Sequence, residues 1–134
     1  MADDPYPLCQ APDPNPMPIT FAVPSGAVDC HAHIFGPESR YPYSSKRGYT
    51  PPDASLETYL NLHQTLGGID RAVLTQPSVY GIDNSCMMDA VDKMGDRFRA
   101  VVALSEDVTD QELEDLHNRG ARGVRVNLVD KGGM

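Results

Sequence analysis

A unit made of a helix, a glycine and a valine-rich strand recurs in this chain of 134 residues. In each copy a helical pattern ends near a glycine, and an arginine a few residues later leads into a short apolar strand. The spacing of roughly 25 residues is that of one strand–helix unit. Strands that alternate with helices form a parallel sheet with right-handed crossovers, so the sequence predicts an α/β fold. The three copies are Gly68 to Arg71-Ala-Val, Gly95 to Arg99-Ala-Val and Gly120 to Arg122-Gly-Val.

Apolar periodicity and cap residues place the individual elements. The predicted strands cover residues 28–35, 71–76, 99–104 and 123–129, and the predicted helices cover 54–66, 84–95 and 109–120. Thr109 and Glu112 match a capping box at the start of the third helix, where Leu113 and Leu116 are expected to face inward. The expected caps of the first two helices are Asp53 or Ser55, and Asn84 or Ser85.

The chain divides into a proline-rich N-terminal arm, residues 1–24, and a domain over 25–134. Seven of the twelve prolines lie in the arm, and proline disfavours regular hydrogen-bonded structure, so an extended segment is expected there. Residues 36–53 form a long loop, and loops of this length are usually functional or disordered. Its tyrosines and cationic residues are consistent either with a lid over an anionic ligand or with an ordinary surface loop. They are Tyr41, Tyr43, Tyr49, Arg40, Lys46 and Arg47.

Charge and composition exclude some partners. The formal net charge is −8, from 19 acidic and 11 basic residues, which argues against nucleic-acid or anionic-membrane binding through bulk charge. A small anionic substrate needs only a local cluster of cations. The three cysteines, Cys9, Cys30 and Cys86, are scattered and lack zinc-type spacing. We therefore expect free thiols, a cytoplasmic location, and neither a secretory signal nor a membrane span.

Polar residues inside the predicted strands require an explanation, because both faces of a helix-covered parallel sheet are buried. In the first strand, alternation places Asp29, His31 and His33 on one face, with the two imidazoles about 7 Å apart. Such a pair can hold a metal or polarise a carbonyl oxygen. Arg125 and Asn127 share one face of the last strand. Since ligand sites form at the C-terminal edge of parallel sheets, these residues predict a site there. The alternative is that Arg125 and Asn127 line an exposed sheet edge.

Four motifs in order resemble the amidohydrolase superfamily, and within it the branch of pyrone-dicarboxylate hydrolases and sugar-lactone hydrolases and isomerases. The resemblance implies a TIM-type (β/α)8 barrel of which this chain supplies the first half, about four strand units. Most of the superfamily uses a divalent metal, whereas the pyrone-dicarboxylate enzymes work without one. The motifs are Cys30-His-Ala-His-Ile-Phe-Gly-Pro, Arg47-Gly-Tyr-Thr-Pro-Pro, Thr75-Gln-Pro-Ser-Val-Tyr-Gly-Ile-Asp-Asn84 and Gly120-Ala-Arg-Gly-Val-Arg-Val-Asn127.

The resemblance also implies roles. His31 and His33 would polarise a lactone carbonyl for attack by water, and no metal is expected. Residues Tyr49, Ser78, Arg125, Asn127 and Lys131 would bind the substrate, a carboxylated lactone, although Lys131 stands where the family's hydrolase is expected to have an arginine. A complete barrel takes about 250 residues, and the family's later histidine and water-activating aspartate fall in a half beyond these residues. The chain alone is therefore expected to be inactive.

Two alternatives remain open at the level of sequence. In the first, His31 and His33 are ligands of zinc or manganese in a metal-dependent amidohydrolase or decarboxylase. In the second, the chain is a non-catalytic half-barrel that pairs its open strand edges with another copy or with a complementary fragment. No lysine lies within the fourth strand, so the carboxylated-lysine bridge of binuclear family members has no evident candidate there.

Overall fold

The fold is a single parallel sheet, as the strand–helix alternation predicts. The computed structural model describes residues 6–128. The four strands lie in the order β1-β2-β3-β4, and each neighbouring pair is parallel. The strands are β1 Val28–Ala32, β2 Arg71–Thr75, β3 Phe98–Val102 and β4 Ala121–Val124. The helices are α1 Leu56–Thr65, α2 Ser85–Met94 and α3 Asp110–Asn118, with short 3-10 turns η1 Ser78–Tyr80 and η2 Gly95–Arg97.

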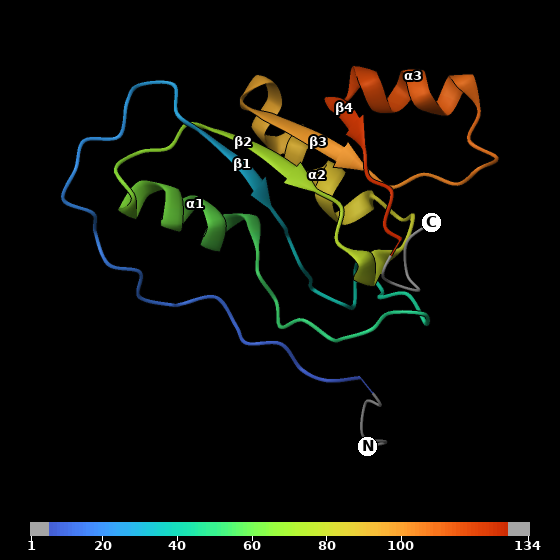
Figure 1. Cartoon of the computed structure of the whole chain (residues 1–134), viewed down its shortest axis with the longest axis horizontal. Helices are drawn as coiled ribbons and strands as arrows, with labels where there is room; N and C mark the ends of the chain where they lie inside the picture. Colours follow the sequence, from blue (N-terminus) through green and yellow to red (C-terminus); the bar gives the residue numbers. More distant parts are fainter. Residues whose placement is uncertain (1–5, 129–134) are drawn as a thin grey trace.

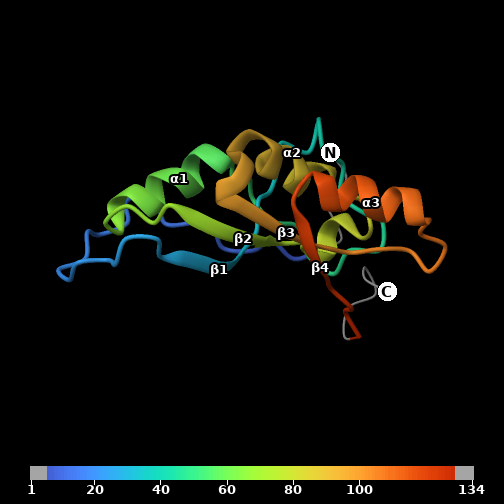
Figure 2. The ribbon, with the colours of Figure 1, turned by 90° about the horizontal axis from the view of Figure 1, so that it is seen from above.

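All three α-helices cover the same face of the sheet (Figures 1 and 2). The core lies between that face and α2, and its largest fully buried side chains include Phe98, Leu74, Met87 and Met88. On the opposite face Val73 and Val101 are only half-buried. The expectation that both faces are buried is therefore wrong for residues 6–128. A sheet covered by helices on one side only is what part of a (β/α) barrel presents, because the other side faces the barrel interior.

The first and last strands are shorter than predicted. β1 ends at Ala32 rather than at residue 35, and Phe35 instead makes an isolated antiparallel bridge with Ala54. β4 begins at Ala121 and ends at Val124, before the predicted 123–129 strand would end. Because β4 is an edge of the sheet in the described part of the chain, the apolar side chains expected on one face there remain exposed: Val124, Val126 and Leu128.

The predicted caps are largely confirmed. Ser55 caps α1 by accepting a hydrogen bond from the Thr58 N–H, and Thr109 and Glu112 form the complete capping box of α3. Asn84 occupies the cap position of α2, yet its side chain makes no capping hydrogen bond there. The prediction that Leu113 faces inward is wrong, because this residue is 40% exposed.

One irregularity in β1 decides which way its side chains point. Asp29 pairs with Ala72 and Ala32 pairs with Leu74, so β1 carries one extra residue between these positions. An extra residue reverses the alternation beyond it. Asp29 therefore shares the helix-covered face with Ala72, whereas His31 and His33 lie on the opposite face. The prediction that all three share one face is wrong.

No helix within residues 6–128 has the length and apolar character needed to cross a bilayer.

Candidate active site

The end of β2 holds two of the predicted site residues. The Nδ1–H of His33 donates to the carbonyl oxygen of Thr75 at 2.7 Å, and Nη1 of Arg125 donates to the carbonyl oxygen of Gln76 at 2.7 Å. Arg125 follows β4 directly, and its own N–H donates to Val102 of β3 at 2.8 Å. Two consecutive carbonyls, at the end of β2 and directly after it, therefore position an imidazole that follows β1 and a guanidinium that follows β4.

The two histidines form a close pair. The ring centroids of His31 and His33 are 5.1 Å apart, and the rings are nearly perpendicular. His31 is exposed and His33 is half-buried. Burial lowers the pKa of His33 from its usual 6.5, and the nearby His31 and Arg125 lower it further, while the Thr75 carbonyl opposes the shift. His33 is therefore neutral near pH 7.

The tautomer of His33 limits its chemistry. Because a carbonyl can only accept, the proton lies on Nδ1, and Nε2 of the neutral ring carries a lone pair. That nitrogen can accept a proton or bind a cation, but it cannot donate to a carbonyl oxygen. Of the two rings, the exposed His31 is thus the one able to present an N–H to a substrate carbonyl.

Asp29 belongs to a separate network beneath β1. Its Oδ2 accepts from the Tyr59 hydroxyl at 2.8 Å and lies 3.5 Å from Nε2 of the buried His63. Its Oδ1 accepts from the backbone N–H of His31 at 3.2 Å. Burial, together with the hydrogen bond to Asp29, raises the pKa of the Tyr59 hydroxyl. His63 is a buried residue of α1, and Asp29 holds the irregular turn of β1 against this helix.

The structure gathers three of the predicted substrate-binding residues and separates the others. Ser78, Arg125 and Asn127 line one small hollow beside Gln76. Tyr49 lies away from this hollow and lines a groove of about 430 Å³ with Phe35 and Ala54. Lys131 lies outside the described residues, as does the end of the predicted fourth strand.

Two cations of the 36–53 loop are engaged with other protein groups. Arg40 forms an ion pair with Asp89 of α2 at 2.8 Å, and the Tyr41 hydroxyl donates to the same carboxylate at 2.7 Å. Burial and this hydrogen bond raise the pKa of Tyr41 to about 12. Arg47 donates to the Thr50 hydroxyl at 3.0 Å. These contacts fix the conformation of the loop. They also direct Arg40 towards α2 rather than towards His31 and His33.

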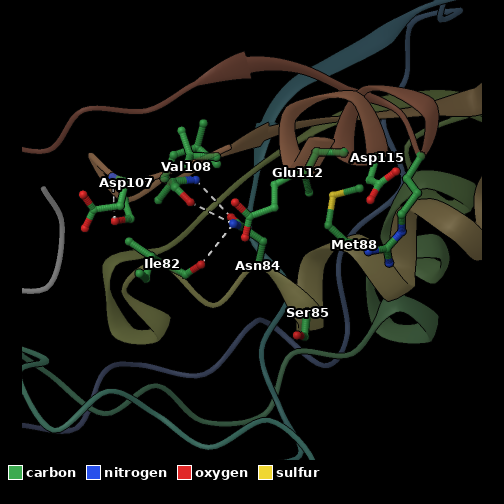
Figure 3. A pocket seen from close by; sticks show the side chains of 13 residues that line it. Ile82, Asn84, Ser85, Met88, Asp107, Val108, Glu112 and Asp115 are labelled. Atoms are coloured by element: carbon green, nitrogen blue, oxygen red, sulfur yellow. Dashed lines mark hydrogen bonds between the residues drawn. The ribbon is translucent and has the colours of Figure 1, made fainter. Parts of the chain in front are cut away.

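The amide side chains of Gln76 and Asn84 were not predicted as site residues, although both occur in the third motif. Nε2 of the buried Gln76 donates to the carbonyls of Gly81 and Asp83, at 3.2 and 2.7 Å. The Asn84 amide exchanges hydrogen bonds with both backbone groups of Ala103 (Figure 3). Together they fasten the β2–α2 connection to the ends of β2 and β3. No local pattern reveals the Asn84 contact, because Asn84 and Ala103 are 19 residues apart in the sequence.

The ligand set for a metal is incomplete in the described part of the chain. No group of three or more His, Cys, Asp and Glu side chains that could hold a metal occurs within residues 6–128. His31 and His33 supply two nitrogens, and Asp29 faces α1. Catalytic zinc sites typically use three protein ligands, so these residues do not by themselves fit a zinc ion.

Comparison with known proteins identifies the family. The amidohydrolase family model matches residues 28–133. The chain belongs to the amidohydrolase family. It is 49% identical over 119 residues to a 4-sulfomuconolactone hydrolase of Rhizobium radiobacter, an alignment that covers 89% of this chain and 40% of that protein. It is 41% identical over 117 residues to a 2-pyrone-4,6-dicarboxylate hydrolase of Comamonas testosteroni, which covers 87% of this chain and 38% of that protein.

Solved structures of amidohydrolases show the same fold. A ligand-free crystal structure of an Agrobacterium tumefaciens protein matches with a TM-score of 0.74 at 35% identity, and the match covers 84% of this chain and 39% of the other. The chain thus spans about 40% of the length of the relatives that it matches. The four strands and three α-helices of residues 6–128 are part of an amidohydrolase barrel, and the predicted family and fold are confirmed.

Proposed function

We propose that this amidohydrolase chain forms part of a hydrolase that opens the ring of an anionic lactone. The observation that carries the proposal is the placement of His33 and Arg125 on consecutive carbonyls at the end of β2. The names of the relatives support the substrate class, since they describe lactones that carry sulfonate or carboxylate groups.

Arg125 suits the recognition of such an anion. A guanidinium has five N–H donors in a planar fork, and the Gln76 carbonyl accepts from only one of its nitrogens, Nη1. Its remaining donors match the two oxygens of a carboxylate or sulfonate. Ser78 and Asn127 line the same hollow and are proposed as further contacts. Tyr49 and Lys131 stay predicted substrate-binding residues that the described geometry does not bring to this hollow.

The two histidines take different roles in the proposed reaction. His31 donates an N–H to the lactone carbonyl oxygen, which makes the carbonyl carbon more electrophilic. Water attacks that carbon, the ring C–O bond breaks, and the released oxygen and the new carboxyl group share the protons of water. In this proposal Nε2 of His33 accepts a hydrogen bond from the attacking water. This assignment modifies the sequence-based hypothesis, in which both imidazoles polarise the carbonyl.

The tautomer of His33 also favours a second candidate function. Histidine ligands of metals usually donate their other N–H to a carbonyl or a carboxylate, as His33 does to Thr75. A metal-dependent amidohydrolase or decarboxylase would use Nε2 of His33, and His31, among its ligands. The remaining ligands would have to come from residues beyond 6–128.

The test has a binding part and a turnover part. Binding of 2-pyrone-4,6-dicarboxylate to the 134-residue chain is measured by calorimetry, and we expect little or no ring opening by this chain alone. Turnover is measured in a chimera that joins it to the remaining C-terminal part of the Rhizobium radiobacter relative. We expect ring opening of 4-sulfomuconolactone or 2-pyrone-4,6-dicarboxylate in the chimera and its loss in His33→Ala. A folded chimera that opens neither lactone would contradict the proposal.

A further inference from the structure

The segment that follows His33 is buried although it belongs to no strand. The His33 imidazole is held by the Thr75 carbonyl, but that bond does not fix the backbone that carries the ring. β1 ends at Ala32, and Ile34 and Gly36 are both buried. Buried backbone groups require hydrogen-bond partners. The groups that supply these partners therefore determine the path of the chain after His33.

Two buried side chains supply these partners, Tyr80 from η1 and Cys86 from α2. The Gly36 N–H donates to the Tyr80 hydroxyl oxygen at 2.8 Å. The Cys86 S–H donates to the Ile34 carbonyl at 3.6 Å, and its Sγ lies 3.9 Å from the Gly36 carbonyl oxygen. Tyr80 and Cys86 are each 4% exposed. Burial raises the pKa of both side chains, so the hydroxyl and the thiol stay protonated at neutral pH.

The fit around this segment leaves little freedom. Gly36 has a φ of +75°, and a Cβ at this position would collide with the carboxylate of Asp53, so only glycine is tolerated here. The ring of Phe35 lies between two others, with its centroid 5.9 Å from that of His33 and 6.4 Å from that of Tyr80. Backbone and ring contacts therefore join His33 to Tyr80.

The same short turn, η1, carries a proposed substrate contact. Ser78 lines the small hollow of the candidate site, and Tyr80 follows two residues later. The Val79 carbonyl between them accepts from the Ser44 N–H at 2.7 Å, which fixes the turn against the neighbouring loop. A shift of η1 would therefore move Ser78 and the segment after His33 together.

We propose that Tyr80 is a positioning residue of the active site, which through the Gly36 N–H sets the distance between the His33 imidazole and the turn that carries Ser78. The placement of His33 by Tyr80 needs no substrate, whereas its consequence for turnover rests on the proposed function. Tyr80 acts through residues 34–36 and does not touch the reacting groups. The distance matters because a misplacement of about 1 Å can slow a reaction about a hundredfold.

The first experiment follows His33 in Tyr80→Phe by NMR, without any ligand. This variant removes the acceptor for the buried Gly36 N–H and changes no charge, so a change in the pKa of His33 reports a change in its surroundings. Burial and the nearby His31 and Arg125 hold that pKa below 6.5. A loosened segment should therefore raise the pKa towards 6.5, and the Gly36 amide should exchange with solvent several-fold faster than in the wild-type chain.

Tyr41→Phe is the matched control. The Tyr41 hydroxyl donates to Asp89 of α2 at 2.7 Å, so each variant loses one tyrosine hydroxyl that makes a short hydrogen bond. Both variants should lose some stability, but only Tyr80→Phe should change the pKa of His33. Equal His33 pKa values and equal Gly36 exchange in the two folded variants would overturn the positioning role.

Cys86→Ala tests the same segment from its other partner. It removes the thiol beside the Ile34 carbonyl and leaves the Tyr80 acceptor in place, so the pKa of His33 should rise less than in Tyr80→Phe. A larger rise in Cys86→Ala would assign the positioning role to Cys86 instead. If Tyr80→Phe does not fold, Cys86→Ala decides alone, and an unchanged pKa of His33 would overturn the proposal.

The last experiment measures turnover in the chimera. Tyr80→Phe should lower kcat about tenfold and change KM less than about twofold, because the groups that bind the lactone are retained while His33 is misplaced. A loss of stability alone would not lower kcat per folded molecule, and Tyr41→Phe should match the parent chimera. Equal kcat in the two variants would overturn the consequence for catalysis. A parent chimera that opens neither lactone would contradict the proposed function, and the pKa of His33 would still decide the role of Tyr80.

Discussion

Replacing Asn84 by alanine should destabilise the fold more than its partial exposure suggests. The side chain lies at the floor of a groove of about 500 Å³ between α2 and α3 (Figure 3). Its Nδ2 donates to the Ala103 carbonyl at 2.8 Å and to the Ile82 carbonyl at 3.1 Å, and its Oδ1 accepts from the Ala103 N–H at 3.0 Å. Ala103 is only 7% exposed.

The size of the effect follows from these contacts. A hydrogen bond contributes about 0.5–1.5 kcal/mol net, and a buried group left without a partner costs about 1–3 kcal/mol. Three bonds are lost, but the open groove lets water reach Ala103 and recover part of the loss. We therefore expect Asn84→Ala to lower the free energy of unfolding by about 2–4 kcal/mol. In urea this corresponds to a midpoint shift of about 1–2 M with an unchanged slope.

Two further variants make the measurement specific. Asn84→Asp keeps an acceptor for the Ala103 N–H but turns a carboxylate oxygen towards the Ala103 carbonyl, so it should be as destabilising as alanine at neutral pH. Protonation restores an O–H donor, so its deficit should shrink in acid. Asn61→Ala removes an exposed amide from α1 and should change stability by less than about 0.5 kcal/mol. An Asn84→Ala variant that loses no more stability than Asn61→Ala would show that the three Asn84 hydrogen bonds do not stabilise the fold.

The remaining predictions concern the site and the sheet edges. In the chimera, Arg125→Ala should weaken the binding of an acidic lactone by about 1.5–3 kcal/mol, the value of a charge-assisted hydrogen bond, and calorimetry showing unchanged affinity would remove Arg125 from the site. NMR titration of His33 should give a pKa below 6.5. Folding favours the neutral imidazole of His33, so the stabilisation that this residue contributes is present above pH 6.5. That stabilisation is lost as the pH falls through the folded-state pKa. In Arg125→Met that pKa should rise, because a neighbouring positive charge is removed, and a fall would contradict the assigned contact. Stoichiometric zinc or manganese in the purified chimera would favour the metal-dependent candidate over the metal-free reaction. Light scattering should detect self-association of the 134-residue chain, because β4 and the residues after it expose Val124, Val126 and Leu128, and a folded monomer would contradict this.

Local signals in the sequence were sufficient for the order and type of the elements. The capping box of Thr109 and Glu112 and the cap of Ser55 act within one helical turn, so spacing alone reveals them. The register shift in β1 has no such signature. Alternation along Asp29, His31 and His33 is consistent with a single face, and only the pairing with β2 shows that the strand carries an extra residue.

The sequence predicts residues for the candidate site but not how they are arranged. The His31-x-His33 motif and Arg125 were found because polar residues are unusual in strands of this kind. The bonds that orient them go to backbone carbonyls of Thr75 and Gln76, and every residue offers such a carbonyl, so no side-chain pattern indicates which one is used. The hydrogen bond between Tyr6 of the N-terminal arm and Ser45 of the 36–53 loop was not predicted either, because the two residues are 39 positions apart in the sequence.

The arrangement of the candidate site therefore depends on β2, although His31 and His33 lie at the end of β1 and Arg125 follows β4. Gln76 combines three tasks at the end of β2. Its N–H donates to Val101 of β3, its carbonyl accepts from Arg125, and its side chain holds the connection to α2. A displacement of Gln76 would move Arg125 and the β2–α2 connection together. The preceding residue, Thr75, holds His33. This coupling explains why a buried glutamine belongs at the edge of an otherwise apolar strand: its hydrogen bonds join the sheet to the groups that would meet the substrate.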